Sequence, residues 1–123
     1  MVKKQHCLTL ELRNDPELIK LYEEYHQPGG VWPEVLDSIR QSGIEDMKIY
    51  RLGSLLIMVL EVDEKFSFDA KSASDASNPM VQKWERLMES FQKVDTTQPD
   101  TQKWQIMSSI FQLDDHKTHE GSD

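Results

Sequence analysis

The sequence predicts a single α+β domain in which helices cover one face of an antiparallel sheet. Its 123 residues are enough for one hydrophobic core but too few for two ordinary domains. Hydrophobic residues make up 37% and charged residues 29%, as is typical of a globular domain. Segments with alternating apolar residues are interleaved with segments in which apolar residues recur every three or four positions, and these are the periods of strands and helices.

The first third of the chain is expected to hold a strand and two helices. Apolar side chains alternate over residues 5–12, which predicts a half-buried strand. Asp15 can cap a helix whose first residue is Pro16, because the missing proline N–H costs nothing at that position. The Gln-Pro-Gly-Gly sequence at 27–30 ends this helix, and a second helix is expected over residues 32–43.

The middle of the chain predicts a hairpin and a short helix. Strands at residues 47–52 and 55–62 flank a Gly53-Ser54 turn. Residues 66–71 are expected to form a short helix. Residues 72–79 are rich in Ser, Asp and Asn and are expected to be a loop.

The last third predicts one more helix and a final strand. Asn78 can cap a helix that begins at Pro79. Its apolar side chains fall at helical spacing, namely Val81, Trp84, Leu87, Met88 and Phe91. Residues 94–102 are expected to be an exposed connection, and the second half of residues 103–113 a strand.

The resulting order of elements is that of the ferredoxin-like split pattern, an antiparallel sheet with helices on one face. One domain is expected over residues 1–113, followed by a flexible acidic tail at 114–123. Ile57 and Val59 make the second face of their strand apolar as well, and such a face needs a cover. Two subunits stacked sheet on sheet would provide it, so we predict a homodimer.

Charge and composition exclude several classes of partner. Asp and Glu outnumber Lys and Arg by 22 to 14, and the net charge of -8 disfavours nucleic acid and anionic membranes. No apolar run approaches the roughly 20 residues of a membrane span. Cys7 is the single cysteine and no apolar signal segment follows Met1, so a cytoplasmic setting is expected. The sequence has no Cys or His cluster of metal-ligand type and no Gly-rich phosphate loop, so we expect neither metal nor cofactor.

One helix end combines a histidine with aromatic residues. Tyr22 and His26 are four residues apart and therefore share a helix face. A histidine can give or take a proton near neutral pH, so His26 is the candidate catalytic residue. The simpler alternative is that His26 only caps the helix by interacting with its dipole.

Three further aromatic residues could bind a sugar. Trp32, Trp84 and Tyr50 have faces that stack on the apolar side of a sugar ring and polar atoms that reach hydroxyl groups. The alternative for each tryptophan is that it only fills the core.

These features together resemble the L-rhamnose mutarotase family. The shared pattern is an early strand, Tyr-x-x-x-His, Trp-Pro-Glu, Gly-Ile with an Ile-Tyr strand, and a helix with Gln-x-Trp, over about residues 4–113. The resemblance implies a dimeric α/β barrel of ferredoxin-like subunits that uses no metal. It also implies that the chain interconverts the α and β anomers of a 6-deoxy-L-sugar, L-rhamnose or L-fucose.

The resemblance also assigns roles to residues. His26 matches the family's acid, Tyr22 a sugar contact, and Trp84 the first of two adjacent pocket tryptophans. Glu85 replaces the second tryptophan, and Met47 stands where the family has a sugar-contacting tyrosine. These two changes alter the pocket wall, so L-fucose or another 6-deoxyhexose becomes a candidate substrate.

The identity of the base and the class of protein each leave alternatives. A water molecule, Tyr22 or Glu34 could act as the base. The same fold hosts monooxygenases and haem-degrading enzymes, and a non-catalytic ligand-binding module is a third possibility.

Overall fold

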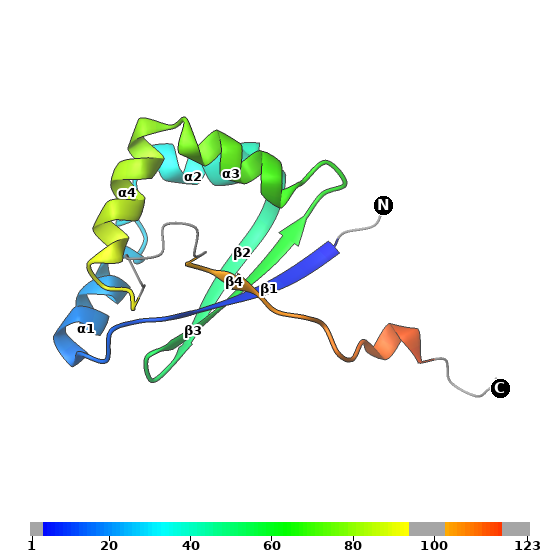
Figure 1. Ribbon diagram of the computed structural model, residues 1–123, viewed down its shortest axis with the longest axis horizontal. Helices are drawn as coiled ribbons and strands as arrows, with labels where there is room; N and C mark the ends of the chain where they lie inside the picture. Colours follow the sequence, from blue (N-terminus) through cyan, green and yellow to red (C-terminus); the bar gives the residue numbers. More distant parts are fainter. Residues whose placement is uncertain (1–3, 94–102, 117–123) are drawn as a thin grey trace.

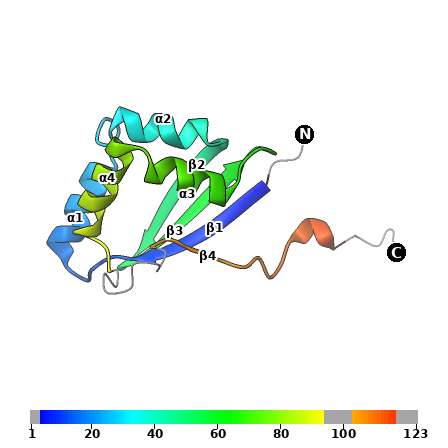
Figure 2. The same cartoon turned by 45° about the horizontal axis from the view of Figure 1, so that its top comes forward.

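The computed structural model describes residues 4–93 and 103–116 (Figure 1). Its elements are β1 (Lys4–Glu11), α1 (Pro16–Tyr25), α2 (Pro33–Gln41), β2 (Ile44–Leu52), β3 (Leu55–Val62), α3 (Phe68–Ala76), α4 (Pro79–Glu89), β4 (Gln105–Ile106) and the 3₁₀ turn η1 (Leu113–Asp115). The strands form one antiparallel sheet in the order β2-β3-β1-β4. The helices lie together on one side of this sheet (Figures 1 and 2). The predicted α+β class and ferredoxin-like order are therefore confirmed.

Local signals set the start of α1 as the sequence predicts. The Asp15 side chain accepts hydrogen bonds from the backbone N–H groups of Glu17 and Leu18, and Pro16 is the first helical residue. The chain then turns back sharply at Gly30. A Cβ at this position would lie 2.5 Å from the carbonyl oxygen of Tyr25, so only glycine allows this close approach to the helix end.

The prediction of a loop at residues 72–79 is wrong over most of that range. Helix α3 runs from Phe68 to Ala76, after an N-cap at Ser67 whose hydroxyl accepts from Ala70 N–H. Lys71 and Asp75 form an ion pair of 2.8 Å one turn apart within it. Asp75 also accepts a hydrogen bond of 3.1 Å from Ser38 of α2. These contacts outweigh the weak helix propensity of the Ser- and Asp-rich sequence.

The prediction for the final strand is also wrong in position. Strand β4 contains only residues 105–106, in the first half of the predicted segment, and pairs with Leu8 and Thr9. Its pairing is extended by a hydrogen bond from Met107 N–H to the carbonyl of Cys7. The following residues leave the sheet and extend away from the body of the molecule (Figures 1 and 2). The predicted connection at 94–102 lies outside the described residues.

The two faces of the sheet differ. On the helix side, leucines of β1 and β3 are buried, including Leu8, Leu10, Leu56 and Leu60. On the other side, Ile57 and Val59 of β3 are half-buried although no described helix covers them. Leu52 and Leu55 at the adjoining hairpin are 82% and 40% exposed. The described helices include none with the length and apolar character of a membrane span.

Candidate functional site

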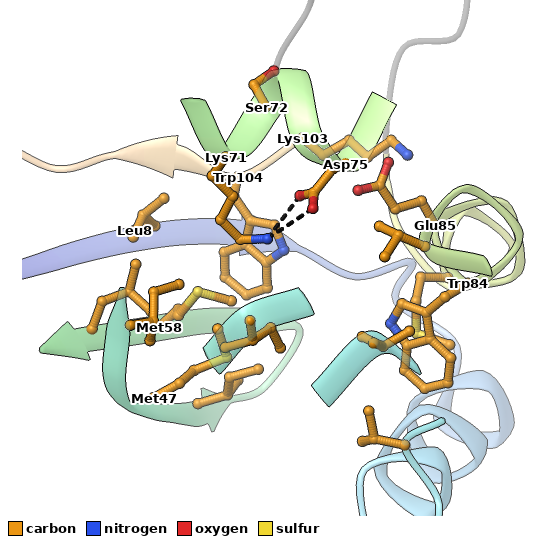
Figure 3. Close-up of a pocket in the computed structure, with 18 of the residues that line it drawn as sticks. Leu8, Met47, Met58, Lys71, Ser72, Asp75, Trp84, Glu85, Lys103 and Trp104 are labelled. Atoms are coloured by element: carbon orange, nitrogen blue, oxygen red, sulfur yellow. Dashed lines mark hydrogen bonds and ion pairs between the residues drawn. The ribbon is translucent and has the colours of Figure 1, made fainter. Parts of the chain in front are cut away.

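A cavity of about 710 Å³ lies between the helices and the sheet. Its size is in the range of small-molecule sites. Figure 3 shows Met47 and Met58 on one side of it and Trp84 on the other. Polar side chains converge on this otherwise apolar space, including Lys71 and Asp75. A mainly apolar wall with a few polar groups is the composition of a ligand-binding site.

His26 is held at the wall of this cavity by the end of α1. It is the C-cap residue, and its Nδ1 lies 2.7 Å from the backbone carbonyl oxygen of Tyr22. Since a carbonyl oxygen only accepts, Nδ1 carries a proton and donates it to this bond. In the neutral ring, Nε2 is then the nitrogen with a free lone pair. Burial lowers the pKa of His26, and the bond to the Tyr22 carbonyl opposes this shift. The neutral ring is therefore the resting form at neutral pH.

Tyr22 supports the imidazole and also lines the cavity. Its ring stacks on the His26 ring with centroids 4.3 Å apart, and it is 4% exposed. Burial raises the pKa of Tyr22 to about 12, while a hydrogen bond from the Gln92 side chain acts in the opposite direction. The phenol therefore keeps its proton at neutral pH and can donate a hydrogen bond into the cavity.

Trp84 links the aromatic residues at this end of the cavity. Its ring meets the His26 ring edge to face, with centroids 5.7 Å apart. Trp32 packs against the other side of this group, with its ring centroid 5.2 Å from that of Trp84. Within the described part of the chain, Trp84 lines the cavity and Trp32 does not. Trp32 thus supports the position of Trp84 from behind.

Glu85 and Met47 also line the cavity. Glu85 follows Trp84 on α4, and burial raises the pKa of its carboxyl group while the positive charge of Lys103 opposes that shift. Figure 3 shows Glu85 and Lys103 on the same side of the cavity. Glu85 thus adds a carboxyl group, and Met47 an apolar group, to a wall that the family resemblance makes aromatic.

The structure does not bring two candidates to the cavity. Tyr50 pairs with Ile57 on the face of the sheet away from the helices and is 58% exposed, because strand alternation turns it away from its neighbour Ile49, which does line the cavity. Tyr50 is therefore not among the described residues that line this cavity, and its role in sugar binding stays a prediction. Glu34, in the first turn of α2, is exposed and is not among the described residues that line the cavity.

Several lining residues carry no signal that singles them out in the sequence. They are Lys71, Asp75, Gln82, Gln92, Lys103 and Trp104. Lys71 and Asp75 are four residues apart, which is the spacing of an ion pair on a helix, but the Ser- and Asp-rich sequence around them favours a loop. Trp104 reaches the cavity because β4 pairs with β1. No local sequence pattern predicts that pairing. Among the described residues, no group of three or more His, Cys, Asp or Glu side chains is arranged to hold a metal ion.

Comparisons with known proteins agree on one family. Residues 5–113 match the family described as L-rhamnose mutarotase. An L-fucose mutarotase of Xanthomonas campestris pv. campestris is 44% identical over 93 residues, which cover 76% of this chain and 74% of that protein. A Dictyostelium discoideum protein named without an activity is 36% identical over 92 residues, 73% of this chain and 71% of that protein.

A solved structure shows the same fold. The crystal structure of an L-rhamnose mutarotase from Formosa agariphila superimposes with a TM-score of 0.66 over 89% of this chain and 97% of that chain. The two sequences are 17% identical.

Proposed function

The chain belongs to the L-rhamnose mutarotase family, and from that premise we propose that it interconverts the α and β anomers of a 6-deoxy-L-hexose. The relative at 44% identity is named for L-fucose, which supports L-fucose as the first sugar to test and L-rhamnose as the second. The family assignment favours a mutarotase over the monooxygenase and the non-catalytic module that the fold alone left open.

The observation that carries this proposal is the geometry of His26 at the cavity wall. Its Nδ1 is occupied by the Tyr22 carbonyl, so Nε2 is available to a substrate. Mutarotation begins when a base takes the proton of the anomeric hydroxyl. The bond between C1 and the ring oxygen then breaks, and the ring oxygen takes up a proton. After rotation about the C1–C2 bond, the aldehyde closes on its other face by the same steps in reverse.

The neutral ring of His26 acts as the base in the opening step at Nε2. Ring closure is the reverse of opening, so the imidazolium then returns its proton to the anomeric oxygen as an acid. The resemblance instead predicts that His26 is the acid in the opening step; we propose the base role because the bond from Nδ1 to the Tyr22 carbonyl leaves Nε2 of the neutral ring with a lone pair and no proton. Tyr22, which stays protonated, is placed to donate a hydrogen bond to a second sugar oxygen. One positioned acid or base contributes about 10²–10⁴-fold to the rate.

The remaining lining residues would hold the sugar ring. Trp84 offers an aromatic face, and Met47 and Met58 form an apolar surface on the other side for the 6-methyl group (Figure 3). Glu85 can accept hydrogen bonds from hydroxyl groups. A ring with one apolar and one polar edge, such as a 6-deoxyhexose, matches this division of the wall.

We also propose that the protein is a homodimer. Ile57 and Val59 lie on the face of the sheet that no described helix covers. The segment after β4, which we call the C-terminal arm (residues 107–115), exposes four large apolar side chains, namely Met107 (44%), Ile110 (95%), Phe111 (64%) and Leu113 (73%). Because the arm extends away from its own subunit (Figure 1), a second copy is the surface that it fits. The single domain over residues 1–113 and the cytoplasmic setting stay predictions.

NMR saturation transfer between the two anomeric protons tests the activity directly. Catalytic amounts of the protein should raise the exchange rate of L-fucose or L-rhamnose above the rate in buffer. A protein that raises the exchange rate of neither sugar, nor of any other 6-deoxyhexose, would overturn the proposed function.

A further inference from the structure

Gln92 carries a buried polar atom that the reaction described above does not use. The residue lies just after α4, is 3% exposed and lines the cavity. Its side-chain oxygen Oε1 accepts no hydrogen bond from the residues that the structure describes. Buried carbonyl groups are nearly always hydrogen-bonded, so an unpartnered one at a cavity wall indicates that a ligand or a water molecule completes it.

The backbone holds Gln92 firmly in this place. Gln92 and Leu12 form an antiparallel bridge next to the end of β1. On either side of it, Arg13 N–H donates to the carbonyl of Phe91 at 2.9 Å, and Lys93 N–H donates to the carbonyl of Glu11 at 2.8 Å. The backbone is therefore fixed on both sides of Gln92, and the side chain cannot leave the cavity wall by a shift of the main chain.

The amide nitrogen of Gln92 faces Tyr22. The Gln92 side chain donates a hydrogen bond to the phenol oxygen of Tyr22, which is the interaction that acts against the rise in its pKa. An amide donates only through nitrogen, so its oxygen stays available as an acceptor. The phenol oxygen then receives the amide hydrogen and can direct its own O–H elsewhere.

The pair of side chains therefore presents one acceptor and one donor next to each other. The acceptor is Oε1 of Gln92 and the donor is the hydroxyl of Tyr22, and both residues line the cavity. A hydroxyl group is a donor and an acceptor at once, so one or two neighbouring sugar hydroxyls can satisfy both groups.

We propose that Gln92 is a substrate-binding residue, which accepts a hydrogen bond from a sugar hydroxyl at Oε1 while its amide nitrogen fixes the hydroxyl of Tyr22. The inference rests on the proposed function, because it takes the ligand to be the sugar.

The test replaces Gln92 by a residue of similar size without polar atoms. Gln92→Leu should lower kcat/KM by about tenfold, mainly through KM, which corresponds to the loss of one hydrogen bond to substrate. Its melting temperature should stay close to that of the wild type, because an unpartnered buried acceptor is removed as well. Gln41→Leu, the same change at an exposed position at the end of α2, serves as the control and should not alter kcat/KM.

Deoxy sugars separate binding from a general effect on the fold. Analogues of L-fucose that lack the 2-, 3- or 4-hydroxyl are compared in wild type and Gln92→Leu. Gln92→Leu should lower kcat/KM by about tenfold for L-fucose. For the analogue that lacks the contacted hydroxyl, the same substitution should leave kcat/KM almost unchanged. Equal losses for L-fucose and all three analogues would overturn the inference, as would an unchanged kcat/KM. If Gln92→Leu does not fold, Gln92→Met, which keeps the chain length, carries the same comparison.

The same data distinguish failure of this inference from failure of the proposed function. If the wild type raises the anomeric exchange rate of no sugar, both the proposed function and the role of Gln92 are wrong. An active wild type whose rate equals that of Gln92→Leu removes only the role of Gln92.

Discussion

The imidazole Nδ1 of His26 lies 2.7 Å from the backbone carbonyl oxygen of Tyr22, one helical turn earlier in the chain. This bond sets the tautomer of the neutral ring, and the stacking of the two side chains sets its plane. A helix end thereby supplies an oriented nitrogen without help from a second charged group.

Removal of the Tyr22 hydroxyl should lower kcat/KM while the ring still stacks on that of His26. Tyr22→Phe keeps the ring beside His26 but removes a donor that lines the cavity. We expect kcat/KM for the preferred sugar to fall by about tenfold, the value of one hydrogen bond. Saturation transfer at several sugar concentrations measures it. An unaltered kcat/KM would show that the phenol makes no contact with substrate in the transition state.

The value of kcat/KM should fall at acid pH and stay level at higher pH. Burial lowers the pKa of His26 from its ordinary value of 6.5, and the neutral ring is the base. The rate constant kcat/KM should therefore be level above pH 6.5 and should fall as the pH drops through the lowered pKa, with a slope that approaches one. Exchange rates measured from pH 4.5 to 8, corrected for the rate in buffer, give the profile.

Glu85 is the control for this profile, since burial raises the pKa of its carboxyl group toward the same range. Glu85→Gln removes that titration and should leave the fall at acid pH in place. If the fall disappears in Glu85→Gln, the titrating group is the carboxyl group and the assignment to His26 is wrong.

Sugar preference should respond to the residue after Trp84. Glu85→Trp restores the second tryptophan that the family resemblance implies, and replaces a hydrogen-bond acceptor by an aromatic face. We expect the ratio of kcat/KM for L-fucose to that for L-rhamnose to change by about threefold to tenfold, the usual contribution of one aromatic contact. Glu85→Gln separates the effect of charge from the effect of shape. A ratio equal to that of the wild type in both variants would mean that Glu85 does not contact the sugar.

The C-terminal arm should contribute to the dimer. Phe111→Asp places a charge on a side chain that is 64% exposed in the single subunit and that we expect to be covered by the partner. Burial of such a side chain contributes about 1.5–3 kcal/mol, so the dissociation constant of the dimer should rise by about tenfold or more. Gln112→Asp, at the neighbouring exposed residue, is the matched control. Sedimentation equilibrium measures both, and a wild type that is monomeric at micromolar concentration with normal stability would contradict the proposed dimer.

Local signals predicted the starts of the two helices that begin with an Asp or Asn cap followed by proline. Asp15 with Pro16 and Asn78 with Pro79 set the starts of α1 and α4, and both starts are confirmed. Helix α3 was only partly predicted, because its second half depends on contacts that the sequence does not display, such as that between Asp75 and Ser38. Strand β4 is two residues long and exists only through its pairing with β1, so no periodicity could locate it.

The candidate site shows the same division. Tyr22, His26 and Trp84 lie on helices with a clear apolar side, so their common position at the cavity follows from helical spacing. The structure places Tyr50 away from the cavity, because Met47 and Ile49 of β2 line the cavity and alternate with Lys48 and Tyr50 on the other side of the strand. Gln92 could not be found from the sequence, since it is a single polar residue whose position depends on contact with the end of β1.

The most direct test of the central claim is the anomeric exchange rate of L-fucose and L-rhamnose in the presence of the wild type and of His26→Ala, measured by saturation transfer at pH 7.5. We expect the wild type to accelerate exchange of at least one sugar and His26→Ala to lose about 10²–10⁴-fold of its kcat/KM while it remains folded. A folded His26→Ala variant with the rate of the wild type would show that this imidazole does not transfer the proton.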